Sequence, residues 1–166
     1  MSKTLFYLLF VLAGCVGVTA CSSDDDGAKD GGRIGVKNVY TTGCKTGGMQ
    51  EASNGAAAAY ALDGAEEYIE YKSKADGYVY VTHVNAMFNC CSEEIKVGVT
   101  ISGNNIVVTE DETSSACNCV CPFDVSYEIG KLVPGQYNVT VKVACIDRVS
   151  FQLTYPSDGK IEINKE

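Results

Sequence analysis

Hydrophobic and polar residues alternate over most of the chain from about residue 66 onward. In the run at 95–102, every second residue is Ile or Val, and polar residues or glycine stand between them. Successive side chains of a β-strand point to opposite faces, so this period predicts strands with one buried face. The same pattern predicts strands at 125–129, 137–145 and 149–155.

A longer alternating run at 78–89 predicts a central strand. Unbroken alternation would place Tyr78, Tyr80, Thr82, Val84, Ala86 and Phe88 on one face, and Val79, Val81, His83, Asn85, Met87 and Asn89 on the other. We therefore expect each set to stay on its own face along the whole strand.

Turn signals separate these segments. Gly103-Asn104-Asn105 favours left-handed backbone before another apolar run at 106–108, which predicts a hairpin. Pro134-Gly135 has the residue order of a tight turn. Weaker strands are expected at 34–40, 66–72 and 161–163.

About seven to eight strands with this turn spacing predict an all-β fold, an antiparallel immunoglobulin-like β-sandwich, with a barrel as the alternative. The segment 41–65 is rich in glycine, alanine and small polar residues and predicts a long loop, with one helical turn at 56–62. One domain is expected to cover residues 33–166.

The beginning of the chain has the pattern of a bacterial lipoprotein signal peptide. Lys3 precedes an apolar run at 5–12, and two Leu/Val-small-small-Cys boxes end at Cys15 and Cys21. Cleavage before Cys15 would leave an apolar stub ahead of the second box. Cys21 is therefore the predicted lipidation site, Cys15 is the alternative, and 1–20 is the expected signal peptide.

The acidic run that follows Cys21 resembles the export signal of Bacteroidota-type surface lipoproteins. The resemblance implies a flexible acidic tether at 21–32 and a protein held at the outer membrane by its lipid, on the cell surface. The covalent lipid is the only attached group expected, and the membrane is the expected partner of that anchor. The net charge of −8 excludes nucleic acid as a partner.

Export matters for the nine cysteines, because disulfides form in the compartments that exported proteins reach. With lipid on Cys21, seven remain as disulfide candidates: Cys44, Cys90, Cys91, Cys117, Cys119, Cys121 and Cys145. Seven is odd, so three disulfides and one free thiol are expected, while the connectivity stays open.

Three of these cysteines form a Cys-x-Cys-x-Cys run whose thiols share one side of an extended chain. We expect two of the three to pair with Cys90 and Cys91, and Cys44 to pair with Cys145. The alternative is a thiolate site for Zn or Cu, because soft sulfur ligands suit these metals. Its ligands would be drawn from Cys90, Cys91, Cys117, Cys119, Cys121 and His83.

The segments His83-x-Asn85-Ala86-x-Phe88-Asn89-Cys90-Cys91, Cys117-x-Cys119-x-Cys121-x-x-Asp124 and Leu132-x-Pro134-Gly135-x-Tyr137 are similar to a recurring set of secreted bacterial proteins and lipoproteins. The resemblance covers roughly residues 66–145 and implies a shared fold and cysteine framework. That family carries no assigned activity, so no catalytic residue is implied.

The sequence argues against an enzyme. The single histidine, His83, lies within a strand pattern and is interpreted as a structural hydrogen-bonding residue. Glu110, Asp111 and Glu112 are interpreted as a solvated acidic loop. The glycines at 43–48 do not form a phosphate loop, because Gly48 is not followed by the Lys and Ser/Thr that would complete one.

A disulfide-stapled binding or interaction module is the expected function, with a glycan or a protein as ligand. Ten tyrosines and five phenylalanines could supply a stacking surface, although tryptophan is absent. Cross-strand packing is the simpler role for Tyr78, Tyr80, Tyr127 and Tyr137.

Overall fold

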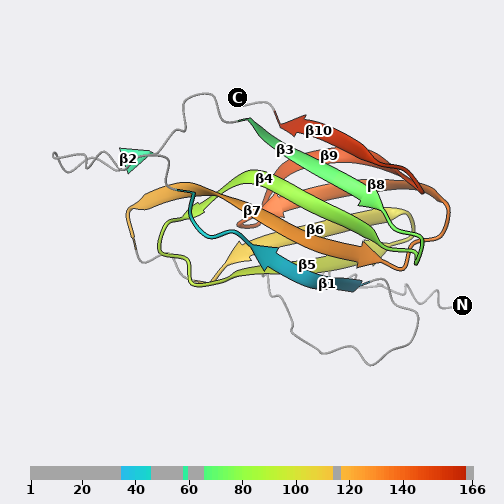
Figure 1. Cartoon of the computed structure of the whole chain (residues 1–166), viewed down its shortest axis with the longest axis horizontal. Coiled ribbons are helices and arrows are strands. Elements are labelled where there is room, and N and C mark those ends of the chain that lie inside the picture. Colours follow the sequence, from blue (N-terminus) through green and yellow to red (C-terminus); the bar gives the residue numbers. More distant parts are fainter. Residues whose placement is uncertain (1–34, 46–57, 60–65, 114–116, 164–166) are drawn as a thin grey trace, which may run out of the picture.

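The structure is a computed structural model that describes residues 35–45, 58–59, 66–113 and 117–163. Two β-sheets pack face to face, as Figure 1 shows, and the described residues contain strands and no helix. The predicted β-sandwich is confirmed. The predicted signal peptide and tether lie outside the described residues, and no helix in the described part could span a membrane.

The first sheet, sheet A, is built around β7 and β4. Its order is β1 (Gly35–Thr41), β7 (Cys119–Gly130), β4 (Val79–Asn89), β3 (Glu67–Ser73) and β10 (Gly159–Ile163), and the short β2 (Ala58–Ala59) pairs with the beginning of β7. All these pairs are antiparallel except the parallel pair of β2 with β7. The expected helical turn at 56–62 is wrong where the structure describes it, because Ala58–Ala59 is extended beside β7.

The second sheet, sheet B, has the order β5 (Ile95–Ser102), β6 (Asn105–Glu112), β8 (Gly135–Val143) and β9 (Ile146–Tyr155). The predicted hairpin joins β5 to β6, with Ser102 opposite Asn105 and Gly103 at φ +58°. β6 and β8 run parallel, because the chain crosses to sheet A through β7 between them.

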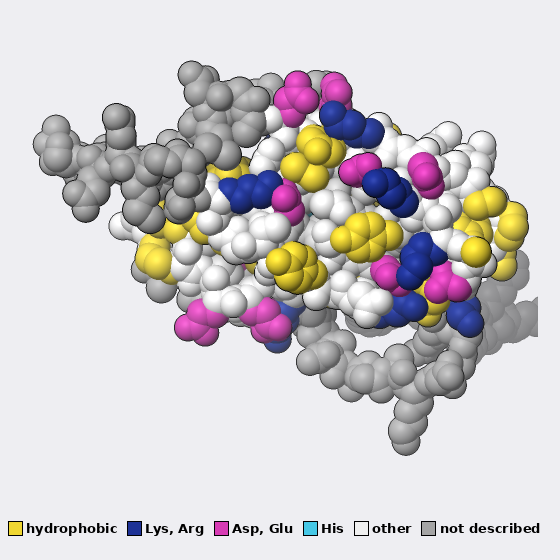
Figure 2. All heavy atoms as spheres, viewed as in Figure 1, with side chains coloured by type: hydrophobic (Ala, Val, Ile, Leu, Met, Phe, Trp, Pro, Cys, Tyr) yellow, Lys and Arg dark blue, Asp and Glu magenta, His cyan; other side chains and the backbone are white. Residues whose placement is uncertain are grey.

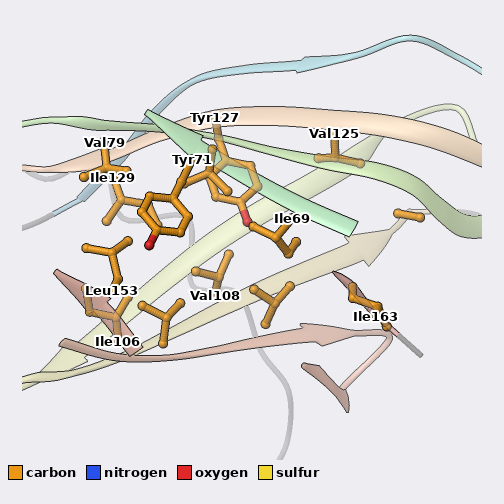
Figure 3. Close-up of a cluster of buried hydrophobic side chains, with 14 of the residues drawn as sticks. Ile69, Tyr71, Val79, Ile106, Val108, Val125, Tyr127, Ile129, Leu153 and Ile163 are labelled. Carbon is orange, nitrogen blue, oxygen red and sulfur yellow. The ribbon is translucent and has the colours of Figure 1, made fainter. Parts of the chain in front are cut away.

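Alternating apolar side chains of both sheets fill the space between them. Figure 3 shows the labelled side chains of β3, β4 and β7 pointing toward those of β6 and β9. Ile69, Tyr127, Val108 and Leu153 are at most 1% exposed. Burial of such side chains, about 1.5 to 3 kcal/mol each, is what holds the two sheets together.

The alternation in β4 reverses halfway along the strand. Val79, Val81 and His83 face the core, but beyond the bulge the buried residues are Ala86 and Phe88. The register with β7 shifts between His83 and Ala86, where Asn85 has φ +59°. The expectation of one continuous face is therefore wrong, because a β-bulge adds one residue and turns the later side chains over.

Candidate functional site

Six cysteines gather at one end of sheet A. Cys44 follows β1, Cys90 and Cys91 follow β4, and the Cys-x-Cys-x-Cys run leads into β7. The order of the strands brings these cysteines together, because β7 lies between β1 and β4. The beginning of β7 lies beside the end of β4, with Val120 opposite Asn89.

These cysteines form three disulfides: Cys44–Cys121, Cys90–Cys119 and Cys91–Cys117, each with a Cα–Cα distance of 5.7 Å. The expectation that Cys90 and Cys91 pair within the Cys-x-Cys-x-Cys run is confirmed. The predicted partner of Cys44 is wrong, since Cys44 lies beside β7 whereas Cys145 lies in the turn between β8 and β9 of the other sheet. Cys145 is disulfide-bonded too, so the expected single free thiol is not found among the seven cysteines of the described residues.

His83 does not join the cysteines. Its side chain is fully buried between the sheets, with Nδ1 2.7 Å from Glu110 Oε2 and Nε2 3.0 Å from Glu67 Oε1. Burial by itself lowers the pKa of His83, but the charges and hydrogen bonds of Glu110 and Glu67 outweigh it and raise this pKa to about 9. His83 is therefore a charged donor to two carboxylates, which agrees with a structural role and removes it from the proposed metal ligands.

The two carboxylates have further partners. Tyr127 donates a hydrogen bond of 3.0 Å to Glu110 Oε1, and Arg148 donates one of 2.6 Å from Nε to Glu67 Oε1 and a second from Nη2 to Oε2. Burial raises the pKa of Glu67, but the hydrogen bonds and charges of Arg148 and His83 prevail and hold it at about 2. Burial, with the charge of Glu110, raises the pKa of Tyr127 well above its ordinary value.

This core network consists of Glu67, His83, Glu110, Tyr127 and Arg148, and it joins β3, β4 and β7 of sheet A to β6 and β9 of sheet B. The interpretation of Glu110 as part of a solvated loop is wrong, because it continues the inward series of β6 and is 0% exposed. Glu110 stands next to two further acidic residues, and such a run is typical of a solvated loop. A signal existed in the alternation itself, since Glu110 stands two residues after the buried Val108.

The outer face of sheet A, the side seen in Figure 2, carries hydrophobic side chains interspersed with lysines and acidic residues. Strand β7 exposes little of its side chains there, since Ser126 and Glu128 are 6% and 7% exposed. Two tyrosine rings stand out: Tyr40 of β1 is 66% exposed and Tyr80 of β4 is 39% exposed. The packing role expected for Tyr127 is confirmed, whereas Tyr80 lies on the solvent face.

Charges on the outer face are paired with one another. Lys72 lies 3.1 Å from Glu70, and Glu128 lies 2.9 Å from Lys74 and 3.5 Å from Lys37. Hydrogen bonding to Lys74 lowers the pKa of Glu128, with burial opposing it. The face therefore has little unbalanced charge to attract an ion.

Cations also lie over two of the aromatic rings. Lys37 Nζ is 3.3 Å from the ring centroid of Tyr78, and Lys160 Nζ is 4.1 Å from that of Tyr68. These contacts occupy one face of each ring. Tyr40 and Tyr80 have no such contact within the described residues, which leaves their rings available to a ligand.

A polar cluster lies beside the bulge of β4. Lys45 Nζ is 2.9 Å from Asn85 Oδ1 and forms an ion pair with Asp124, whose Oδ1 also accepts a 3.0 Å hydrogen bond from the backbone N–H of Asn85. The cluster ties the segment after β1 to β4 and β7. Its side chains are half-buried and satisfied by one another.

Together the fold and the site define a β-sandwich stapled by disulfides at one end, joined through its core by a charged network, and bearing exposed tyrosines on one sheet. No family model matches the chain, and neither a curated protein nor a solved structure matches it.

Proposed function

We propose that this protein is a lipid-anchored protein of the outer membrane that presents its sandwich at the cell surface as a binding module. The observation that carries the binding role is the exposure of Tyr40 and Tyr80 on a rigid sheet among charges that neutralise one another. Apolar surface that gathers on one face often marks a binding site, and the rings of Tyr40 and Tyr80 share the outer face of sheet A.

Strand pairing sets the distance between the two rings. Tyr40 lies opposite Ser126, which lies opposite Thr82, and Tyr80 is two residues from Thr82 on the same face. With strands about 4.8 Å apart, the two Cα positions are roughly 12 Å from each other. A ligand that covers both rings must therefore be an extended one, such as an oligosaccharide or a protein segment.

The core network supports a binding role over a catalytic one. A catalytic acid or base must reach a substrate, but His83 and Glu110 are 0% exposed and Glu67 is 4% exposed. The hydrogen bonds of these three side chains go to one another, to Arg148 and to Tyr127. We propose that the protein is not an enzyme.

The anchor in this proposal is a lipid on Cys21 or Cys15, and its support is the signal-peptide pattern and the acidic run after Cys21. A lipid at the beginning of the chain would hold the sandwich at the membrane by a tether. Labelled palmitate incorporated by the cells, together with protease accessibility on intact cells, tests this part of the proposal. Protection of the sandwich from external protease would overturn the surface location.

The binding role is tested with residues 33–166 on an array of glycans and proteins. For a bound ligand, Tyr40→Ala and Tyr80→Ala are each expected to weaken affinity at least about tenfold, as tyrosines central to an interface do. The matched control is Ile146→Ala, which removes a side chain that is 72% exposed on sheet B. The proposal fails if nothing binds, or if the control weakens binding as much as the tyrosine variants do.

A further inference from the structure

Two of the disulfides lie unusually close together. The sulfur atoms of Cys44, Cys90 and Cys121 all lie within 4.8 Å of one another, although Cys44 and Cys121 belong to one disulfide and Cys90 to the next. Cys119, as the disulfide partner of Cys90, brings a fourth sulfur to the same place. We propose that these four cysteines, once reduced, form a binding site for one Zn²⁺ ion.

The strand order explains why four sulfurs converge. Cys119 and Cys121 are two residues apart on β7 and project to the same side. Cys90 comes from the β4 side of this strand and Cys44 from the β1 side. Backbone hydrogen bonds from Lys45 N–H to the Pro122 carbonyl and from Cys90 N–H to the Cys119 carbonyl do not involve the sulfurs. We expect these bonds to keep the thiols close when the disulfides open.

The distances suit zinc after small side-chain rotations. Four thiolates at about 2.3 Å around a tetrahedral Zn²⁺ lie about 3.8 Å from one another. Sulfurs already within 4.8 Å need to move about 1 Å, which a change of rotamer supplies. Four cysteines are also a common ligand set of structural zinc sites.

The surroundings also favour a bound cation. Cys121 is 2% exposed, and Cys44 and Cys90 are half-buried against the hydrophobic core. An apolar surrounding limits access of water and strengthens the attraction between thiolates and a cation. This site differs from the ligand set expected from the sequence, since it includes Cys44 and leaves out His83, Cys91 and Cys117.

The chemistry balances with a named reductant. A phosphine reduces both disulfides, which take up four electrons and four protons in total, while two phosphines become phosphine oxides with oxygen from water. Zinc binding then displaces protons from the thiols, because the thiolate is the ligand form. The ion would hold β1, β4 and β7 together in the reduced chain, as the two disulfides do in the oxidised chain.

The test uses the purified chain, reduced with a phosphine under anaerobic conditions, with free thiols counted before metal is added. One equivalent of Co²⁺ should produce the sulfur-to-cobalt charge-transfer bands of a tetrahedral thiolate site, and Zn²⁺ should bleach them. Native mass spectrometry should show one metal ion per chain. Cys90→Ser and Cys44→Ser should each weaken Co²⁺ binding at least about tenfold.

The matched control is the double variant Cys91→Ser/Cys117→Ser, which removes the third disulfide and should keep the cobalt bands. Circular dichroism on every sample reports whether the strands persist. Equal loss in the control and in Cys90→Ser would mean that an unfolded chain binds metal through any of its cysteines, which overturns the proposal. Absence of bands in the fully reduced chain, folded or unfolded, overturns it as well.

Discussion

His83 Nδ1 lies 2.7 Å from Glu110 Oε2 across the interface between the two sheets, and neither side chain is exposed to solvent. A charge buried in this way is tolerated only while its partner is present, because its hydration has been lost. The pair therefore makes the docking of sheet B on sheet A depend on both residues.

Removing one member of this pair should destabilise the fold strongly. For Glu110→Ala we expect a loss of about 3 to 5 kcal/mol in the free energy of unfolding, measured by urea denaturation. The reason is that His83 would keep a buried charge with one carboxylate fewer, and Tyr127 would lose its acceptor. Glu70→Ala is the control, since it removes an exposed pair with Lys72 and should cost less than about 1 kcal/mol. A similar small loss for Glu110→Ala would contradict the role of the network.

Stability should be highest between about pH 4.5 and 6.5. The pKa of His83 is raised from 6.5 to about 9, so its stabilisation is complete below pH 6.5 and is lost as pH rises through 9. The pKa of Glu67 is lowered from 4.5 to about 2, so its stabilisation is present above pH 4.5 and is lost as pH falls through 2. The melting temperature measured from pH 2 to 10 tests this profile. In His83→Gln the alkaline decline should flatten, and an unchanged decline would assign it to other groups.

The three disulfides should contribute unequally. With Cys90–Cys119 in place, Cys91–Cys117 closes a loop of only roughly five residues and should contribute about 2 kcal/mol. Cys44–Cys121 joins residues 77 apart in sequence and, even when shortened by its neighbour, should contribute about 4 kcal/mol. Denaturation of the two double Cys→Ala variants compares them. The reverse order would show that loop closure is not the dominant effect.

Local patterns were sufficient for the fold class. Alternation at 95–102 and the Gly103-Asn104 turn act through near neighbours, and both led to the observed β5–β6 hairpin. The pairing of Cys90 and Cys91 with the Cys-x-Cys-x-Cys run also followed, because these cysteines lie at the ends of two strong strand patterns. Such features depend on side-chain direction and chain proximity, which a sequence displays directly.

The candidate site required the tertiary structure. Which strand lies beside β7 determines that Cys44 bonds to Cys121 and that Tyr40 shares a face with Tyr80. The bulge at Asn85 exchanges the buried and exposed positions in the second half of β4. The alternation pattern of the sequence does not reveal this inserted residue.

What the sequence by itself determined was the alternating strands, the β5–β6 turn and the presence of a disulfide framework, because period and local turn chemistry are properties of neighbouring residues. What the tertiary structure decided was that Glu110, His83 and Arg148 belong to one hydrogen-bonded network. These residues are distant in sequence and come together only when the two sheets pack. A carboxylate in water and the same carboxylate in a core look alike in a sequence. They differ because burial removes hydration, and only the packed partners replace it.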